Sequence, residues 1–182
     1  MPRVLLTGFM PFGDHVDNIS EKLVNSMPLV LPIRNPFGPG RSEISIEKKI
    51  LTVDVEGSAW TQDELETREW DAILHLGLCG DCTDARIELR AQDALDMNIP
   101  DNSGRQIVGE KISGNGDLMT PVQVKRWDID SWKIQPTLST DAGRYLCNET
   151  YYRTLDALRL SDVDVPCLFL HLPDSSHMAT SD

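Results

Sequence analysis

The sequence has no long apolar runs, few basic residues and few cysteines. No stretch approaches the roughly 18 apolar residues that a membrane-spanning helix needs, and the first residues show no signal-peptide pattern, so we expect a cytoplasmic protein with no membrane partner. Lys and Arg number 17 against 29 Asp and Glu, which gives a net charge of -12. Because such a field repels phosphates, it argues against nucleic acid as a partner and favours small neutral or weakly charged substrates.

Only four cysteines occur in 182 residues, and their uneven spacing does not fit a disulfide-stapled secreted domain. We therefore expect reduced thiols. Cys79 and Cys82 form a Cys-x-x-Cys pair, which can bind a metal or cycle between dithiol and disulfide. His75 lies four residues before the pair, but the sequence shows no second pair of zinc ligands. The favoured interpretation is a loop with incidental cysteines, with metal or redox chemistry as the alternative.

Apolar runs typical of buried strands alternate along the chain with helical patterns. The strand patterns fall at residues 4–7, 44–55, 72–78 and 166–172. The helical patterns occupy four stretches: 18–27 with Asn18 as cap, 58–66, a start at Thr120-Pro121, and 144–160 after the cap candidate Asp141. This order predicts one domain with an α/β fold, a three-layer α/β/α sandwich around a mostly parallel, mixed sheet.

Three residues form a candidate catalytic group. Cys147 lies near the N-terminal end of a predicted helix, where the helix dipole and free backbone N–H groups stabilise a thiolate. His171 closes a buried strand, and helix N-termini meet strand C-termini at one edge of an α/β sheet. Glu88 lies in an alternating stretch and can supply the carboxylate that orients the histidine. The alternatives are packing roles for the cysteine and histidine, and a salt bridge from Glu88 to Arg86 or Arg90.

Taken together, these segments resemble the pyroglutamyl peptidase I (pyrrolidone carboxyl peptidase) family of cysteine peptidases. The matching blocks occur in the family's order and span nearly the whole chain: VLLTGFMPFG at 4–13, LGL at 76–78, Glu88, IPDN at 99–102 with Gly104, DAGRYLCN at 141–148, and FLHLP at 169–173. The block around Cys147 is the most specific of the set.

The resemblance implies an enzyme that removes an N-terminal pyroglutamyl residue from peptides through a thioacyl intermediate, without a cofactor or metal. Cys147 is then the nucleophile, His171 the general base and acid, and Glu88 the group that orients the imidazole. The same resemblance implies a lactam pocket lined by Phe9, Phe12, Thr52, Ile99, Tyr145 and Leu146. Such walls suit a small uncharged ring. A homo-oligomer is also allowed, since family members commonly self-associate.

Two departures from the family pattern bear on activity. Asn98 stands where the family usually has an arginine near the active site, and an amide carries no charge. The family also continues past the FLHLP block into another helix, whereas a polar tail follows here, so we expect a single domain over residues 1–182 that lacks this C-terminal helical extension. A catalytically weak or inactive homologue, which uses the lactam pocket for binding or interaction, is therefore the alternative function.

The charge lost at Asn98 generates a test. Restoring a cation with Asn98→Arg stabilises the thiolate and the oxyanion but not the uncharged lactam, so we expect a higher kcat, a nearly unchanged KM, and alkylation of Cys147 by iodoacetamide at lower pH. Steady-state kinetics and alkylation rates measure both effects. If neither quantity changes in a folded variant, position 98 lies outside the electrostatic reach of the sulfur.

Overall fold

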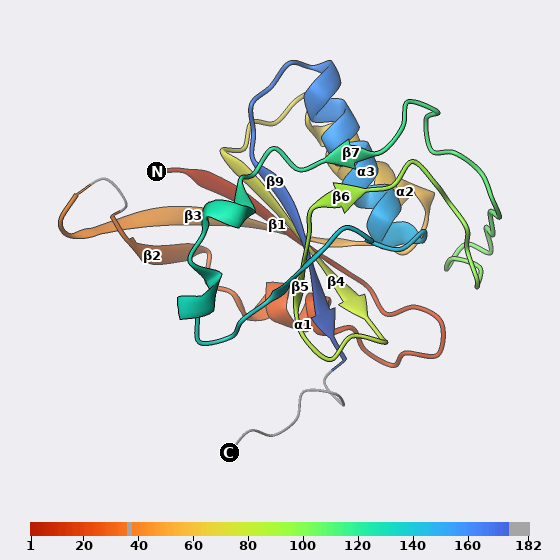
Figure 1. Ribbon diagram of the computed structural model, residues 1–182, viewed down its shortest axis with the longest axis horizontal. Helices are drawn as coiled ribbons and strands as arrows, with labels where there is room; N and C mark the ends of the chain where they lie inside the picture. Colours follow the sequence, from red (N-terminus) through yellow and green to blue (C-terminus); the bar gives the residue numbers. More distant parts are fainter. Residues whose placement is uncertain (36–37, 175–182) are drawn as a thin grey trace.

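The computed structural model describes residues 1–35 and 38–174 and contains a central sheet flanked by helices (Figure 1). Seven strands form the main sheet in the order β2-β3-β1-β4-β9-β5-β8. Their bounds are Val30–Arg34, Arg41–Leu51, Arg3–Phe9, Ala72–Cys79, Cys167–Pro173, Arg86–Glu88 and Thr137–Ser139, in that spatial order. Only the β2–β3 and β5–β9 pairs of this sheet are antiparallel. The predicted α/β fold with a mixed, mostly parallel sheet is confirmed.

In the part of the chain that the structure describes, three α-helices cover the two faces of the sheet. Helix α1 (Ile19–Ser26) packs on one face, while α2 (Val55–Glu64) and α3 (Leu146–Leu160) lie together on the other (Figure 1). A small two-stranded sheet, β6 (Arg90–Ala91) with β7 (Leu118–Met119), borders α3. Within the described residues, no helix is both long and apolar enough to cross a bilayer.

Strand alternation divides the core between the two faces. Leu5, Ile73 and Phe169 belong to the cluster shared with α2 and α3, whereas Leu6 and Leu76 belong to the cluster under α1. Side chains on successive strand residues point to opposite faces, so odd-numbered residues of β4 and β9 face α3. This alternation decides which strand residues can meet a side chain from α3.

Helix boundaries differ from the sequence-based prediction where caps were misjudged. Helix α2 begins three residues early because the Asp54 carboxylate accepts a hydrogen bond from the Gly57 N–H at 2.8 Å. Helix α3 begins at Leu146, with Tyr145 rather than Asp141 as its N-cap. The prediction of a helix at Thr120-Pro121 is wrong: short 3-10 turns follow instead, at Val124–Arg126 and Ile129–Ser131. Asn18, by contrast, caps α1 as predicted.

Candidate active site

Side chains from three elements meet on the sheet face that α3 covers. Register places His171 of β9 beside Gly77 of β4, and Glu88 of β5 beside Phe169 of β9. Cys147 is the second residue of α3, and its sulfur packs against Gly77. The fold therefore brings together Glu88, Cys147 and His171, as the sequence analysis expected for an α/β sheet edge.

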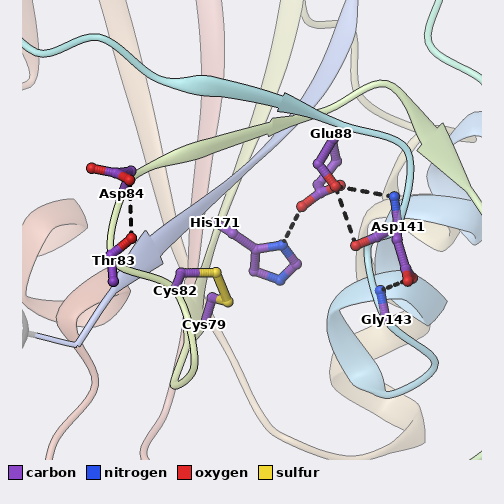
Figure 2. Close-up of a disulfide and its surroundings, with 9 residues drawn as sticks. Cys79, Cys82, Thr83, Asp84, Glu88, Asp141, Gly143 and His171 are labelled. Atoms are coloured by element: carbon purple, nitrogen blue, oxygen red, sulfur yellow. Dashed lines mark hydrogen bonds and ion pairs between the residues drawn. A yellow bond between two sulfur atoms is a disulfide. The ribbon is translucent and has the colours of Figure 1, made fainter.

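Glu88 and His171 form a buried pair. Glu88 Oε1 lies 2.8 Å from His171 Nδ1, and the glutamate side chain is fully buried (Figure 2). Tyr151, also fully buried, donates a hydrogen bond from its hydroxyl to the Glu88 carbonyl at 3.0 Å and so fixes β5 against α3. In the described part of the chain, Glu88 Oε2 has no hydrogen-bond partner. The imidazole is thus held through Nδ1, which leaves Nε2 for other chemistry.

The surroundings of His171 favour its protonated form. Burial alone lowers the pKa of the imidazole, but interactions with Cys147 and then with Glu88 outweigh burial and raise the pKa to about 9. At neutral pH the ring therefore carries a positive charge between a carboxylate and a sulfur. An imidazolium beside a cysteine is the arrangement that favours a thiolate nucleophile.

The start of α3 offers backbone donors beside the sulfur. Tyr145 gives no side-chain cap, and among the described residues nothing accepts a hydrogen bond from the amides of residues 146–148. Asn148 anchors this turn, since its side chain donates to the carbonyls of Gln92 at 2.8 Å and Ala94 at 3.1 Å. The Gln92 N–H in turn donates to Asn148 Oδ1 at 2.8 Å. The helix start is therefore held firmly with its N–H groups free.

Gly77 makes room for the sulfur. A Cβ atom at this position would lie 2.8 Å from Cys147 Sγ and 2.7 Å from the Phe169 ring, closer than real Cβ contacts. The sequence analysis treated LGL at 76–78 only as a strand end within a family block. A glycine in a buried strand signals close approach of another group, and that signal indicates the contact found here.

A small apolar pocket adjoins Cys147. Four of the predicted lactam-pocket residues line it: Phe9, Phe12, Tyr145 and Leu146. Asn18, Val53 and Leu78 also line it and were missed, because they come from loops and strands whose convergence is not visible in sequence. Its free space is about 10 Å³, close to the volume for one water molecule. The pocket is nearly filled by its own side chains.

The other predicted pocket residues lie outside this lining. The Thr52 hydroxyl donates to Asp54 Oδ1 at 2.6 Å, next to the cap of α2. Ile99 is 42% exposed on the turn before Pro100, whose carbonyl accepts a hydrogen bond from the Tyr145 hydroxyl at 3.1 Å. Asn98 is exposed on the same turn. The turn at residues 98–101, which the Tyr145 contact ties to the pocket, is called the pocket rim below.

Among the described residues, neither Arg86 nor Arg90 forms the salt bridge to Glu88 that the sequence left open as an alternative. Arg90 pairs with Asp117 at 3.2 Å and donates to the Thr140 carbonyl at 2.8 Å. Arg86 lies opposite His171 in the β5–β9 register, and within the described residues it forms no ion pair with Glu88. Antiparallel pairing places β9 beside Glu88. The partner of the carboxylate is therefore the histidine of β9 rather than an arginine.

The expectation of reduced thiols is wrong for one pair. Cys79 and Cys82 form a disulfide, while Cys147 and Cys167 are free. The two residues between the paired cysteines form a tight turn that brings the Cα atoms within 5.4 Å of each other. His75 is fully buried with its ring nitrogens 2.7 Å from the Thr7 hydroxyl and 3.1 Å from the Thr154 hydroxyl, and burial lowers its pKa to about 3.

The volume of a pocket does not identify the candidate active site in this protein. A larger hollow of about 540 Å³ lies beside Arg3, Trp70 and Val165, at the sheet edge opposite Cys147 and His171. It holds none of the three candidate catalytic residues. Over residues 1–35 and 38–174, no cluster of three or more histidine, cysteine or acidic side chains could hold a metal ion.

The geometry is that of a cysteine hydrolase: a thiol at a helix start, a buried histidine–carboxylate pair, and an adjoining apolar pocket. Comparison with known proteins gives the family. The pyroglutamyl peptidase family model matches residues 2–181, and the chain belongs to this family of cysteine peptidases.

Individual relatives agree in sequence and fold. The chain is 29% identical to the pyrrolidone-carboxylate peptidase of Fusobacterium nucleatum over 95% of this chain and 78% of that protein. The structure of the pyrrolidone carboxyl peptidase of Thermococcus litoralis matches 100% of this chain and 81% of that one, with a TM-score of 0.81 and 27% identity. The enzyme structure from Fervidobacterium islandicum matches 95% and 81%, with a TM-score of 0.79 and 31% identity.

The Gly77 contact can be tested with a matched pair of glycine variants. Gly77→Ala must displace Cys147 Sγ or the Phe169 ring, so we expect at least about 1 kcal/mol lower free energy of unfolding and slower alkylation of Cys147 by iodoacetamide. Gly80→Ala is the control, because nothing lies within 4 Å of a Cβ there. Urea unfolding and alkylation rates give the two readouts. Equal behaviour of the two variants would show that the sulfur does not depend on Gly77.

Proposed function

We propose that the protein is a cysteine peptidase that removes N-terminal pyroglutamyl residues from peptides. The observation that carries the proposal is the placement of Cys147 beside His171, which is itself bound to buried Glu88, in a chain that belongs to a family of pyroglutamyl peptidases. The small apolar pocket next to the sulfur supplies a place for the ring.

The reaction begins with attack of the Cys147 thiolate on the carbonyl carbon of the pyroglutamyl residue. A tetrahedral intermediate forms, and the His171 imidazolium donates its proton to the leaving amine as the thioester forms. Neutral His171 then takes a proton from water, and hydroxide attack on the thioester releases pyroglutamate and the thiolate. Glu88 keeps the ring in one orientation through Nδ1 and stabilises its charged form.

The first turn of α3 is the proposed oxyanion site. The amides of residues 146–148 are free of partners in the described part of the chain and lie at the positive end of the helix dipole. Such donors contribute roughly 3 to 4 kcal/mol to the stabilisation of a tetrahedral oxyanion. Because these donors belong to the backbone, their effect does not depend on a cation at position 98.

The pocket favours an uncharged ring. Its lining is mostly aromatic and aliphatic, and the burial of an unpaired charge there would be costly. The Phe12 ring lies 5.8 Å from the Tyr145 ring, centroid to centroid, and both side chains are only partly buried. We infer that movement of Phe12 admits the lactam, since Tyr145 is tied to the Pro100 carbonyl by its hydroxyl.

The nearly filled pocket favours one alternative function. A homologue whose pocket opens rarely would bind the lactam weakly and turn it over slowly, or serve as an interaction module. In this alternative the same residues form the site, but turnover of the pyroglutamyl substrate is slow or absent.

A chromogenic assay distinguishes the two functions. Purified, reduced protein should release the aniline from pyroglutamyl 4-nitroanilide but not from prolyl 4-nitroanilide, whose ring has a charged nitrogen and no lactam carbonyl. Cys147→Ala should abolish turnover, whereas Cys167→Ala should retain it because Cys167 lies at the far end of β9. Binding of pyroglutamate without turnover would reject the peptidase and support the alternative.

The raised pKa of His171 predicts an alkaline limit to activity. As pH rises through about 9, the imidazolium loses the proton that the leaving amine needs, so kcat/KM should fall. Glu88→Gln removes the negative charge that helps raise this pKa, so the fall should move to lower pH.

The exposed Glu56 on α2 provides the control for this pH measurement. Glu56→Gln changes the net charge by the same amount and should leave the profile in place. A Glu88→Gln enzyme whose alkaline limb stays at the wild-type pH would contradict the proposed role of the carboxylate.

A further inference from the structure

The Cys79–Cys82 disulfide stands on the same sheet face as the proposed nucleophile. Gly77 and Cys79 are two residues apart on β4, so their side-chain positions project from one face. That is the face where Cys147 Sγ packs against Gly77. In the adjacent strand, His171 pairs with Gly77 and Pro173 with Cys79. Figure 2 shows the disulfide beside the His171 ring, on the side away from Glu88.

Strand geometry sets the distance that local movement must close between Cys79 and Cys147. Each strand residue advances about 3.3 Å, so Cys79 lies about 7 Å along β4 from Gly77. Cys147 Sγ is 2.8 Å from the Cβ position of Gly77. Cys79 is half-buried at the end of the strand, and the turn that follows it is exposed at Gly80 and Asp81. When the disulfide is reduced, the Cys79 side chain is free to rotate toward Cys147.

Cys167 cannot take part in this chemistry. It pairs with Ile73 at the beginning of β9, six residues before Pro173, and is fully buried. Burial also raises the pKa of its thiol. The cysteines that can exchange are therefore Cys79, Cys82 and Cys147.

We propose that Cys79 and Cys82 form a resolving dithiol that restores Cys147 after its oxidation by a peroxide. The inference rests on the proposed function, because a reactive thiolate is the form of cysteine that peroxides oxidise. Hydrogen peroxide transfers an oxygen atom to the Cys147 thiolate, giving a sulfenic acid and hydroxide. The Cys79 thiol then attacks the sulfenic sulfur, so that a Cys147–Cys79 disulfide forms and water leaves.

Thiol–disulfide exchange completes the relay. Cys82 gives its proton to the hydroxide released in the first step, attacks the Cys79 sulfur and expels Cys147 as a thiolate, which leaves a Cys79–Cys82 disulfide. Two electrons have passed from the dithiol to the peroxide, and a thiol reductant returns the pair to its reduced form. The structure has the sulfur arrangement of the final state, with a closed Cys79–Cys82 bond, a free Cys147 and an intact His171–Glu88 pair.

Peptide mass mapping after oxidation tests the relay. The full-length protein is reduced, freed of reductant, treated with an equimolar amount of hydrogen peroxide and then blocked with iodoacetamide. Wild type should contain a Cys79–Cys82 disulfide and alkylated Cys147. Cys82→Ser and Cys82→Ala should accumulate a Cys147–Cys79 disulfide that dithiothreitol reverses. In Cys79→Ser, one equivalent of peroxide should instead leave Cys147 as sulfenic acid, with any fraction that meets a second peroxide becoming sulfinic acid, so that Cys147 escapes alkylation.

Cys167→Ala is the matched control and should behave as wild type, since it removes a free thiol outside the relay. Two Cys82 variants are used because Cys82 is fully buried and one replacement can disturb folding. The proposal is overturned if no Cys147–Cys79 disulfide forms in either folded Cys82 variant, or if Cys79→Ser protects Cys147 as well as wild type does. Peptide mapping measures the oxidation state of each cysteine directly. Its result therefore does not depend on whether the protein hydrolyses pyroglutamyl peptides.

Discussion

The buried carboxylate of Glu88 has His171 as its charged partner, and the positions of three strands follow from that contact. One oxygen lies 2.8 Å from the imidazole, while the other has no hydrogen-bond partner in the described residues. A buried charge without a counter-charge is costly, so the protonated imidazole stabilises the contact between β5 and β9. β9 also pairs with β4, and the same register sets Gly77 beneath the sulfur. The geometry of the candidate site therefore depends directly on the register of the sheet.

A second buried carboxylate fixes the helix that carries Cys147. Glu149, one turn into α3, accepts a two-pronged contact from Arg105 at 3.2 and 2.6 Å, and a further contact from Arg153 at 2.8 Å. Arg105 also binds Asp101 at 2.9 Å, in the turn that follows Ile99. Paired arginine–carboxylate contacts of this kind are directional as well as attractive. The pocket rim and the start of α3 therefore hold each other in position.

Local sequence patterns predicted the fold because each of its main strands and helices has a recognisable pattern within its own residues. Apolar runs located β1, β4 and β9, and Asn18 located the start of α1. The start of α3 was misplaced because Asp141 is a good cap by residue type, yet its carboxylate accepts instead from the Gly143 N–H at 3.1 Å. Cap choice depends on how the preceding loop packs, and that is a tertiary property.

The candidate site was likewise predicted only in part from the sequence. Glu88, Cys147 and His171 were grouped as candidates because residue types, helix start and strand end combined with a family resemblance. The partner of Glu88 was left open between histidine and arginine, since alternation within one strand says nothing about the strand beside it. The pairing of Cys79 with Cys82 was held only as the alternative, because composition describes the chain as a whole, whereas the bond depends on one tight turn. The role of Gly77 depends on its contact with α3, which only the folded structure shows.

The filled state of the apolar pocket has a thermodynamic consequence for ligand binding. With free space for about one water molecule, the described conformation is not the one that accepts a five-membered ring. A ligand then binds only the fraction of molecules in which the pocket is open, and its apparent dissociation constant rises by the reciprocal of that fraction. Any ligand, partner or substitution that favours the open form tightens binding without touching the ring. Affinity at this site is therefore set as much by the packing of Phe12 against Tyr145 as by contacts to the ligand.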